Sequence, residues 1–410
     1  MRIAVIGAKG LPANQGGIEH YCQEIYPRMV ERNHSVDLFA RSSYLSSSWL
    51  EQYKYKGVRV ISLPCLQLRG ADAFFTSLLG AIAASSSQYD IIHFHALGPS
   101  VFSWLPKFAS TAKVVVTCQG LDWQRAKWGK VSSRILYAGE RAAARFADGI
   151  VVVSDELRAY FKQTYNRETV YIPNGPARYA PTDGCFAYGT SLGLTPGKYI
   201  TYVGRLVPEK RPDLLIQAFQ KLKPRDWKLV LVGGTSDTNA FATELFNLAT
   251  HNPNIVFTGE LRGQKLAEIV RGAGCFTLPS DLEGLPLAML EAMQEGVPVV
   301  ASDIPAHQQL IARDRGLLFE AGDVTDCTQT LERAIANPEA LTAMANRAQE
   351  YVQQHHNWDD ITTETLNVYK TLCQTTKSQT TKILPSVAKQ TTTPVQASEK
   401  NKSLNAKHVN

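Results

Sequence analysis

Short apolar runs rich in β-branched residues alternate with longer amphipathic runs along the first half of the chain. The amphipathic runs have the length and periodicity of helices, and the clearest lie at 18–32 and 131–146. The predicted strands between them are 2–7, 35–40, 58–63, 91–95, 113–118 and 149–154. Strands that alternate with helices favour a parallel sheet with crossover helices, so the first half is predicted to be of the α/β class.

A second alternating series follows a polar stretch, 177–197, whose Gly and Pro content is typical of a linker. Its predicted strands are 199–204, 228–233, 254–259, 275–279 and 298–302. Because 410 residues are too many for one ordinary core, we expect two doubly wound domains at 1–180 and 190–355. Ligands of such sheets bind at the carboxyl ends of the strands, which predicts a cleft between the domains.

The end of the chain changes character after residue 373. Apolar residues on one face of 358–373 predict a helix that needs a surface to pack against. From 374 to 410 the chain is rich in Thr, Gln, Lys and Ser and has no aromatic residue. Such a segment cannot bury enough apolar surface to offset its ordering entropy, so 374–410 is predicted to be a disordered tail.

Composition and charge narrow the class of protein. The chain is 44% hydrophobic, which excludes wholesale disorder. Its net charge is +6, but the six lysines and one glutamate from Gln374 onward contribute +5. The body is nearly neutral, so we predict no nucleic-acid partner. Seven scattered cysteines without a Cys-x-x-Cys pair favour a reducing compartment and no metal site.

The sequence resembles neither a signal peptide at its start nor a transmembrane helix elsewhere. Met1 to Gly7 has the pattern of a strand and turn rather than of a signal peptide. The longest apolar stretch, 73–84, is shorter than the ~20 residues that span a bilayer. We therefore expect a cytoplasmic protein without a transmembrane helix.

Three loops after predicted strands carry residues suited to an anionic ligand. Gly16 and Gly17 precede the first helix, where backbone N–H groups attract phosphate, although a simple tight turn is the alternative. The spacing is not that of a dinucleotide fingerprint, which disfavours a nicotinamide oxidoreductase. Gly204 and Arg205 begin the loop that ends at Lys210, and two cations there could hold a diphosphate or could simply be solvated.

The most specific pattern lies at 280–293. Glu283 is in a loop, and Glu291 follows eight residues later, about two turns into a helix. N–H groups near Gly284 and Leu285 could meet a phosphate while the two carboxylates accept hydrogen bonds from hydroxyls. An amphipathic helix with an incidental Glu is the alternative. The carboxylates would repel a phosphate unless the cations of the preceding loop offset them, so the motifs make physical sense together.

These motifs, with Ile-Pro-Asn-Gly at 172–175 and the run 281–302, resemble the retaining family 4 glycosyltransferases of the GT-B fold. The resemblance covers about residues 1–373. The segment 120–128 is similar to a bacterial subgroup that includes rhamnosyltransferases of polysaccharide assembly. The fold implied is two Rossmann-like domains that face a cleft, with the 358–373 helix packed back on the first domain.

The resemblance also implies roles for single residues. Gly16 and Gly17 would approach the donor diphosphate, Arg205 and Lys210 would stabilise the leaving nucleoside diphosphate, and Glu291 would hold the ribose. Further implied donor contacts are Glu283, with the transferred sugar, and Gly204, Gly284 and Leu285. Members of the family need no metal or cofactor, and none is expected here.

One position departs from the family pattern. Many members carry His in a Thr-x-His context, whereas here Gln119 ends Thr-Cys-Gln-Gly. Glutamine can hydrogen-bond a hydroxyl, but it cannot carry a proton, so a general base at this position is in doubt. His93 and His95 end another strand, where they could line the cleft or could be satisfied inside the core.

A basic helix face is the last candidate site. Arg134, Arg141 and Arg145 fall on one side of the predicted 131–146 helix, and Trp123, Arg125, Lys127, Trp128 and Lys130 precede it. Basic residues beside tryptophan suit an anionic membrane surface or a lipid diphosphate acceptor, and a solvated helix face is the alternative.

The motifs and the family resemblance together imply a retaining glycosyltransferase that moves a sugar, from dTDP-rhamnose or another hexose donor, to a carbohydrate or lipid-linked acceptor. It would act in cell-surface polysaccharide or glycolipid synthesis, in the cytoplasm or on the inner face of the plasma membrane. A nucleotide-sugar epimerase and a non-catalytic nucleotide-sugar-binding subunit are the alternatives.

Overall fold

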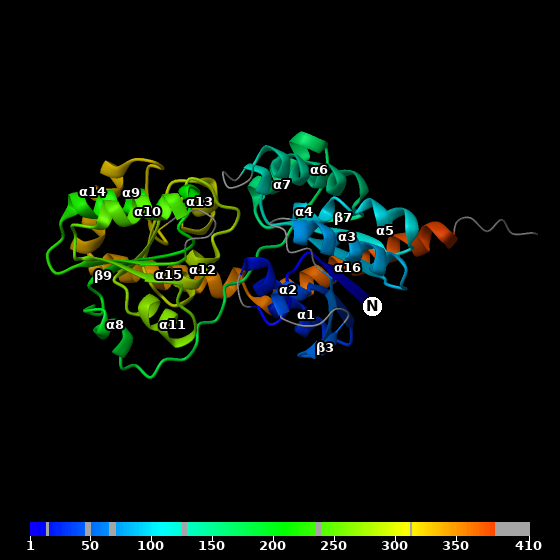
Figure 1. The fold of residues 1–410 in the computed structure, drawn as a ribbon, viewed down its shortest axis with the longest axis horizontal. Coiled ribbons are helices and arrows are strands. Elements are labelled where there is room, and N and C mark those ends of the chain that lie inside the picture. Colours follow the sequence, from blue (N-terminus) through cyan, green and yellow to red (C-terminus); the bar gives the residue numbers. More distant parts are fainter. Residues whose placement is uncertain are drawn as a thin grey trace, which may run out of the picture. The chain divides into compact units, whose positions relative to one another are not determined.

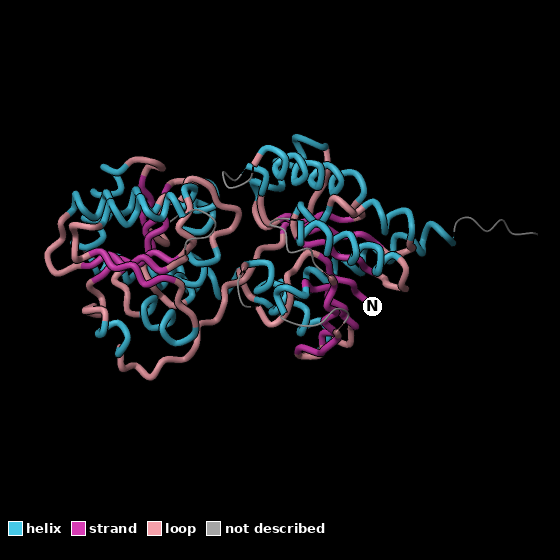
Figure 2. The backbone as a smooth tube through the Cα atoms, viewed as in Figure 1, coloured by secondary structure: helices cyan, strands magenta, loops and turns pink. Residues whose placement is uncertain are grey.

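The computed structural model describes residues 1–13, 16–45, 51–64, 71–124, 129–234, 239–311 and 314–381. Two parallel sheets, each with helices on both sides, organise these residues (Figures 1 and 2). The predicted α/β class with two doubly wound, Rossmann-like sheets is confirmed. Residues 1–373 form one compact unit.

The first sheet has eight strands in the order β3-β4-β2-β1-β5-β6-β7-β8. The strands are β1 (Arg2–Ile6), β2 (Ser35–Arg41), β3 (Gln52–Tyr55), β4 (Val58–Leu63), β5 (Ile91–His95), β6 (Lys113–Cys118), β7 (Gly149–Val152) and β8 (Val170–Tyr171). All neighbouring strands pair in parallel except β3 and β4, which form an antiparallel pair. The central strands β1, β5 and β6 are buried on both faces, which explains their continuous apolar sequences.

Each face of this sheet has its own core, because successive strand residues point to opposite sides. Ile3 and Val5 belong to one cluster, whereas Ala4 and Ile6 belong to the other. The helices of this half are α1 (Gly17–Glu31), α2 (Ser42–Leu45), α3 (Ala71–Ser85), α4 (Leu97–Ser100), α5 (Trp104–Ala109), the 3-10 turn η1 (Asp122–Gln124), α6 (Lys130–Phe146) and α7 (Asp155–Tyr165).

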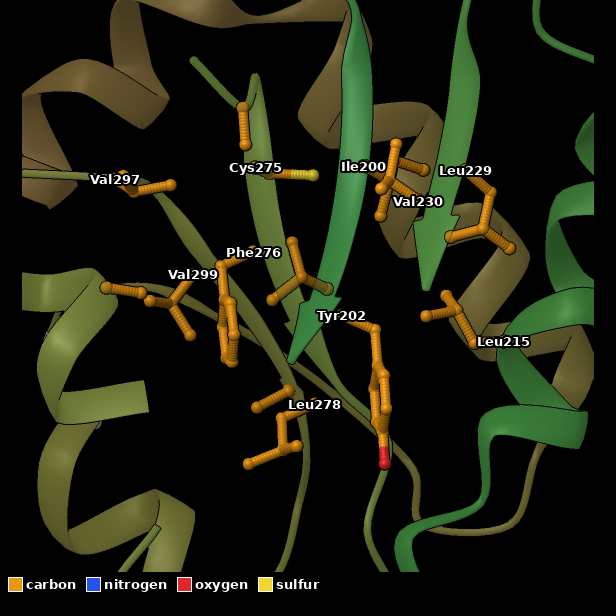
Figure 3. Packing of buried hydrophobic residues seen from close by; sticks show 14 of the residues in the cluster. Ile200, Tyr202, Leu215, Leu229, Val230, Cys275, Phe276, Leu278, Val297 and Val299 are labelled. Carbon is orange, nitrogen blue, oxygen red and sulfur yellow. The ribbon is translucent and has the colours of Figure 1, made fainter. Parts of the chain in front are cut away.

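The second sheet has six strands in the order β11-β10-β9-β12-β13-β14, all paired in parallel. The strands are β9 (Tyr199–Val203), β10 (Lys228–Val232), β11 (Ile255–Gly259), β12 (Cys275–Leu278), β13 (Val299–Ser302) and β14 (Leu317–Phe319). Figure 3 shows its core, where Ile200, Tyr202 and Phe276 pack between neighbouring strands and helices. The strand order places the ends of β9 and β12 side by side, which matters for the site.

Helices cover both faces of the second sheet (Figure 1). They are α8 (Ala187–Ser191), the 3-10 turn η2 (Pro208–Lys210), α9 (Pro212–Leu222), α10 (Asn239–Ala249), α11 (Gly263–Arg271), α12 (Leu287–Gln294), α13 (Pro305–Ile311), α14 (Val324–Ala336) and α15 (Pro338–His355). None of the helices in the described part of the chain is both long and apolar enough to cross a bilayer.

The last helix, α16 (Trp358–Thr381), joins the core of the first sheet. Trp358 Nε1 donates a hydrogen bond to the carbonyl of Pro176 at 2.9 Å. The buried Tyr369 hydroxyl lies 2.5 Å from His93 Nδ1 on β5. The helix continues past residue 373, where the tail was predicted to begin. Residues 382–410 lie outside the described part, so their disorder stays a prediction.

Candidate functional site

The loops that follow β9 and β12 meet through an ion pair. Lys210 ends η2, and its Nζ lies 2.6 Å from Glu283 Oε1. The side chains are only 17% and 12% exposed. A backbone hydrogen bond of 2.9 Å from Asp281 to the carbonyl of Glu209 ties the same two loops together. Two motifs about seventy residues apart in sequence therefore form one charged cluster at the carboxyl edge of the second sheet.

Glu283 is held as a carboxylate. Burial by itself would raise its pKa, but the ammonium of Lys210 and the hydrogen bond from Ser280 Oγ at 2.9 Å outweigh burial and lower it. The Arg205 guanidinium, in the same loop as Lys210, has no ion-pair partner among the described residues. The loop that follows β9 thus offers one paired and one unpaired cation to an anionic ligand.

Glu291 lies on α12 in a different environment. Its Oε2 accepts a hydrogen bond of 3.1 Å from the Tyr179 hydroxyl, which comes from the segment that joins the two sheets. Burial raises the pKa of Glu291 to about 7, although the bonds from Tyr179 and from the backbone of Ala177 oppose the shift. Sequence reasoning missed Tyr179, because no fixed spacing relates it to α12.

Glycines allow close backbone approach at this edge. A Cβ atom on Gly284 would lie 2.3 Å from the carbonyl oxygen of Gln119, and one on Gly17 would lie 2.9 Å from Leu287 Cδ1. A Cβ on Gly204 would lie 2.9 Å from the Tyr202 hydroxyl. Leu285, beside Gly284, is partly buried and packs against residues of both halves of the chain.

The first turn of α1 carries an acidic residue that sequence reasoning overlooked. Glu19 is almost fully buried and accepts a hydrogen bond of 2.9 Å from the backbone N–H of Lys9. Gly16 has φ of 95°, and a Cβ atom there would lie 2.2 Å from Glu19 Oε2. A side chain at position 16 would therefore collide with this carboxylate, which explains the glycine there. Its position two residues after Gly17 was the available signal.

Gln119 contacts another of the predicted motifs. Its Oε1 accepts a hydrogen bond of 2.6 Å from Asn174 Nδ2. The buried Gln119 Nε2 and Asn174 Oδ1 have no hydrogen-bond partner among the residues that the structure describes. A buried donor and acceptor left unpaired are costly, and a bound hydroxyl group can satisfy both.

His93 and His95 belong to a buried polar cluster rather than to an exposed surface. His95 Nε2 lies 2.6 Å from the Tyr26 hydroxyl, and His93 Nε2 lies 2.7 Å from Thr117 Oγ1. Both side chains are 0% exposed. Burial lowers the pKa of His95 to about 3, so the ring is neutral at physiological pH. The expectation that His95 lines the cleft is not met here, because it packs between aromatic side chains.

The basic helix face is exposed on α6. Arg134, Arg141 and Arg145 are all exposed, and none forms an ion pair with another described residue. Val131 on the same helix is 70% exposed, and Phe108 on the neighbouring α5 is 75% exposed. The predicted contributors Arg125, Lys127 and Trp128 lie outside the described residues.

A pocket of about 320 Å³ opens beside Glu283. Residues of β6–η1, of α7 and of the loop before α12 line it. They are Gly120, Leu121, Gln124, Ser154, Glu156, Leu157, Ala159, Tyr160, Gln163, Leu282, Glu283 and Gly284. In the described part of the chain, no group of three or more His, Cys, Asp or Glu side chains is placed to hold a metal ion.

Comparison with known protein families identifies the class of enzyme. Residues 16–175 match the glycosyl transferase 4-like domain, and residues 191–351 match the glycosyl transferases group 1 family. The two matches together span most of the chain. The protein belongs to the group 1, family 4 glycosyltransferases, and the predicted enzyme class is confirmed.

The individual proteins to which the chain is similar have low sequence identity to it. The chain is 27% identical over 440 residues to a D-inositol 3-phosphate glycosyltransferase from Gordonia bronchialis, covering 96% of this chain and 93% of that protein. It is 28% identical over 344 residues to an alpha-maltose-1-phosphate synthase from Mycolicibacterium smegmatis, covering 76% and 87% of the two chains.

Solved structures confirm the GT-B fold. A sucrose-phosphate synthase from Thermosynechococcus elongatus superposes with a TM-score of 0.78 at 22% identity, covering 91% of this chain and 99% of that one. HepE from Anabaena, solved with UDP and glucose, superposes with a TM-score of 0.74 at 20% identity, covering 90% and 100%.

Proposed function

We propose that the protein transfers a sugar, with retention of configuration, from a nucleoside-diphosphate sugar to a hydroxyl of a carbohydrate or lipid-linked acceptor. The observation that carries the proposal is the Lys210–Glu283 ion pair, formed by a loop that also carries Arg205, which has no ion-pair partner among the described residues. Together these groups supply a carboxylate for sugar hydroxyls and two cations for a leaving diphosphate.

Catalysis then depends on charged side chains that are already in position before the substrate binds. Arg205 and Lys210 stabilise the negative charge that develops on the diphosphate as the glycosidic bond breaks. The partial burial of Lys210 strengthens this interaction, because the effective dielectric constant is lower away from bulk water. Backbone N–H groups at Gly284 and Leu285 add further donors near the amino end of α12.

The two glutamates divide the recognition of the donor. Glu283 accepts hydrogen bonds from the transferred sugar, while Glu291 accepts them from the ribose. Gly16 and Gly17 approach the diphosphate, and Gly204 leaves room for the backbone of its loop. The unpaired Nε2 of Gln119 is a hydrogen-bond donor for a hydroxyl of the donor sugar.

No protein base is assigned to the acceptor. Gln119 cannot carry a proton, and His95 is enclosed by other side chains. The acceptor hydroxyl attacks the face from which the diphosphate departs, and a phosphate oxygen of the leaving group takes its proton. This same-face attack retains the configuration of the anomeric carbon, and no metal or cofactor takes part.

Rhamnose, from dTDP-rhamnose, is the first donor to test, because segment 120–128 is similar to the rhamnosyltransferase subgroup. Other hexose donors follow, because a protein of similar fold was solved with UDP and glucose. The acceptor would belong to cell-surface polysaccharide or glycolipid synthesis.

We also propose that the protein binds peripherally to the inner face of the plasma membrane. The exposed arginines of α6 and the exposed Val131 and Phe108 combine positive charge with apolar surface, which suits an anionic bilayer. Sedimentation with phosphatidylglycerol vesicles tests this at low salt. Binding that survives replacement of Arg134, Arg141 and Arg145 by Glu would contradict it.

Donor turnover distinguishes the proposed function from its alternatives. Nucleoside diphosphate released only with an acceptor supports transfer. An altered sugar nucleotide formed without acceptor would favour an epimerase. Tight binding without turnover would favour a binding subunit, in which case the cations at the leaving group would have no catalytic purpose.

A further inference from the structure

The pocket beside Glu283 joins the charged cluster to the first half of the chain. One wall is α7, which begins at the capping residue Ser154, whose Oγ accepts a hydrogen bond from the N–H of Leu157. Leu282, Glu283 and Gly284 form another part of the lining. A molecule in this pocket would therefore lie next to the carboxylate that we assign to the transferred sugar.

The chemistry of the lining suits a sugar ring. Tyr160 offers an aromatic ring, and Leu121 and Leu157 add apolar surface. Gln124 and Gln163 carry amides that both donate and accept hydrogen bonds, which matches hydroxyl groups. A few polar groups in a partly apolar cavity of this size are typical of small-molecule sites.

The charge of the lining discriminates between ligands. Among the described lining residues, the charged side chains are Glu156 and Glu283, and both are carboxylates. Glu283 is already paired with Lys210. Among the lining residues that the structure describes, Glu156 has no basic neighbour to neutralise it, so its carboxylate disfavours a phosphate at this place and accepts hydrogen bonds from a hydroxyl.

A buried carboxylate outside the pocket fixes its walls. Glu140 on α6 is 0% exposed and accepts three hydrogen bonds from neutral donors. Tyr160 and Tyr165 donate to Oε1 at 2.7 and 2.5 Å, and Trp123 Nε1 donates to Oε2 at 2.7 Å. Through these bonds Glu140 links the aromatic wall of the pocket to the η1 turn that carries Gln124.

A charge buried without a cation is expensive, and Glu140 has no ion-pair partner among the described residues. A core needs no such group for stability, since an apolar side chain would pack there at lower cost. The arrangement is better explained by the need to hold two pocket walls at a fixed separation.

We propose that this pocket is the acceptor subsite, that it takes an uncharged sugar ring, and that Glu140 is its positioning residue. The inference rests on the proposed glycosyl transfer and deepens it by naming the class of acceptor. In this respect the acceptor differs from the phosphorylated inositol in the names of several relatives.

Ligand-observed NMR on the full chain tests the pocket without turnover. The probes are methyl α-glucoside, methyl α-mannoside and methyl α-rhamnoside, compared with glucose 6-phosphate and mannose 6-phosphate, all in the presence of UDP. We expect saturation transfer to at least one neutral glycoside and weaker transfer to both phosphates. Ala159→Trp, at an exposed position of the lining, should abolish the signal. Arg158→Trp, exposed on the same helix and outside the lining, is the matched control and should preserve it.

Two variants test the positioning role of Glu140. Glu140→Gln keeps an oxygen for the two tyrosines but turns an N–H₂ group toward the Trp123 indole N–H, so the η1 wall is released. We expect glycoside binding to weaken roughly tenfold, about 1.4 kcal/mol. Tyr165→Phe removes one bond to the same carboxylate without touching the pocket and should leave binding unchanged. Equal losses in both variants would indicate general structural damage and overturn the positioning role.

Three results would overturn the subsite. They are tighter binding of a sugar phosphate than of its glycoside, signals that Ala159→Trp leaves unchanged, and no binding of any probe. A chain that binds neutral glycosides in this pocket but turns over no nucleotide sugar would contradict the proposed function instead, so the two failures are distinguishable.

Discussion

Removing the ammonium group of Lys210 tests the central ion pair most sharply. Lys210→Met keeps most of the aliphatic volume and leaves Glu283, which is 12% exposed, without its cation. Breaking one side of a buried pair costs ~3–5 kcal/mol, and the slight exposure of both side chains places this pair near the lower limit. Loss of one group that stabilises developing charge lowers turnover ~10²-fold or more.

The pH dependence of stability separates this reasoning from a loss of packing. In the wild type the lowered pKa of Glu283 stabilises the fold above the ordinary carboxyl pKa, and that contribution is lost as pH falls through the folded-state value. Lys210→Met removes the strongest of the interactions that lower this pKa, and only the weaker effects of His307 and of the Ser280 hydrogen bond still oppose burial. The pKa of Glu283 should therefore rise, so that the carboxylate destabilises the fold at neutral pH and protonation relieves it. The gap in unfolding free energy between the two proteins should therefore shrink between about pH 8 and about pH 4.

Urea titrations followed by tryptophan fluorescence measure the stability gap, and release of nucleoside diphosphate measures turnover. Lys221→Met, at an exposed position in the last turn of α9, is the matched control and should change neither quantity. Wild-type turnover in Lys210→Met would refute the assigned role. A stability gap that stays constant with pH would refute the electrostatic account of the pair.

Three other outcomes follow from the same structure. Because the pKa of Glu291 is raised to about 7, the donor KM should rise as pH falls below that value, and Glu291→Gln should abolish the dependence in initial-rate measurements. Gly284→Ala places a Cβ atom 2.3 Å from the carbonyl of Gln119 and should lower turnover ~10²-fold, whereas wild-type kinetics would show that the loop tolerates displacement. Tyr369→Phe removes the hydroxyl 2.5 Å from His93 Nδ1 and should cost about 1 kcal/mol in a urea titration, and an unchanged midpoint would contradict the anchoring of α16.

Much of the fold was predictable because the central strands are buried on both faces. Continuous apolar runs gave β1, β5, β6, β9 and β10 to within a residue or two. The strands that escaped prediction are at or near the edges of the sheets. The side chains of β3 are only exposed or partly buried, and β8 and β14 have two and three residues, so none of them carries a strong periodic signal.

The residues of the candidate site, too, were predictable only in part. Lys210 and Glu283 were expected to act together because carboxylates beside a phosphate need nearby cations to offset them, and the two side chains form an ion pair. Glu140 and Tyr179 were not predicted, because each meets its partners through tertiary packing that has no fixed spacing in the sequence. His95 lies at a strand end, where a polar side chain can point either into the core or toward a ligand, and the sequence does not distinguish the two.

The most direct test of the account is mass-spectrometric detection of donor turnover. The full chain would be incubated with UDP-, GDP- and dTDP-sugars, with and without a lipid extract of the source cells. The account predicts that one nucleoside diphosphate is released in an acceptor-dependent way, together with a glycosylated product of retained configuration. Tight donor binding with no turnover under any acceptor, or a modified sugar nucleotide without acceptor, would contradict it.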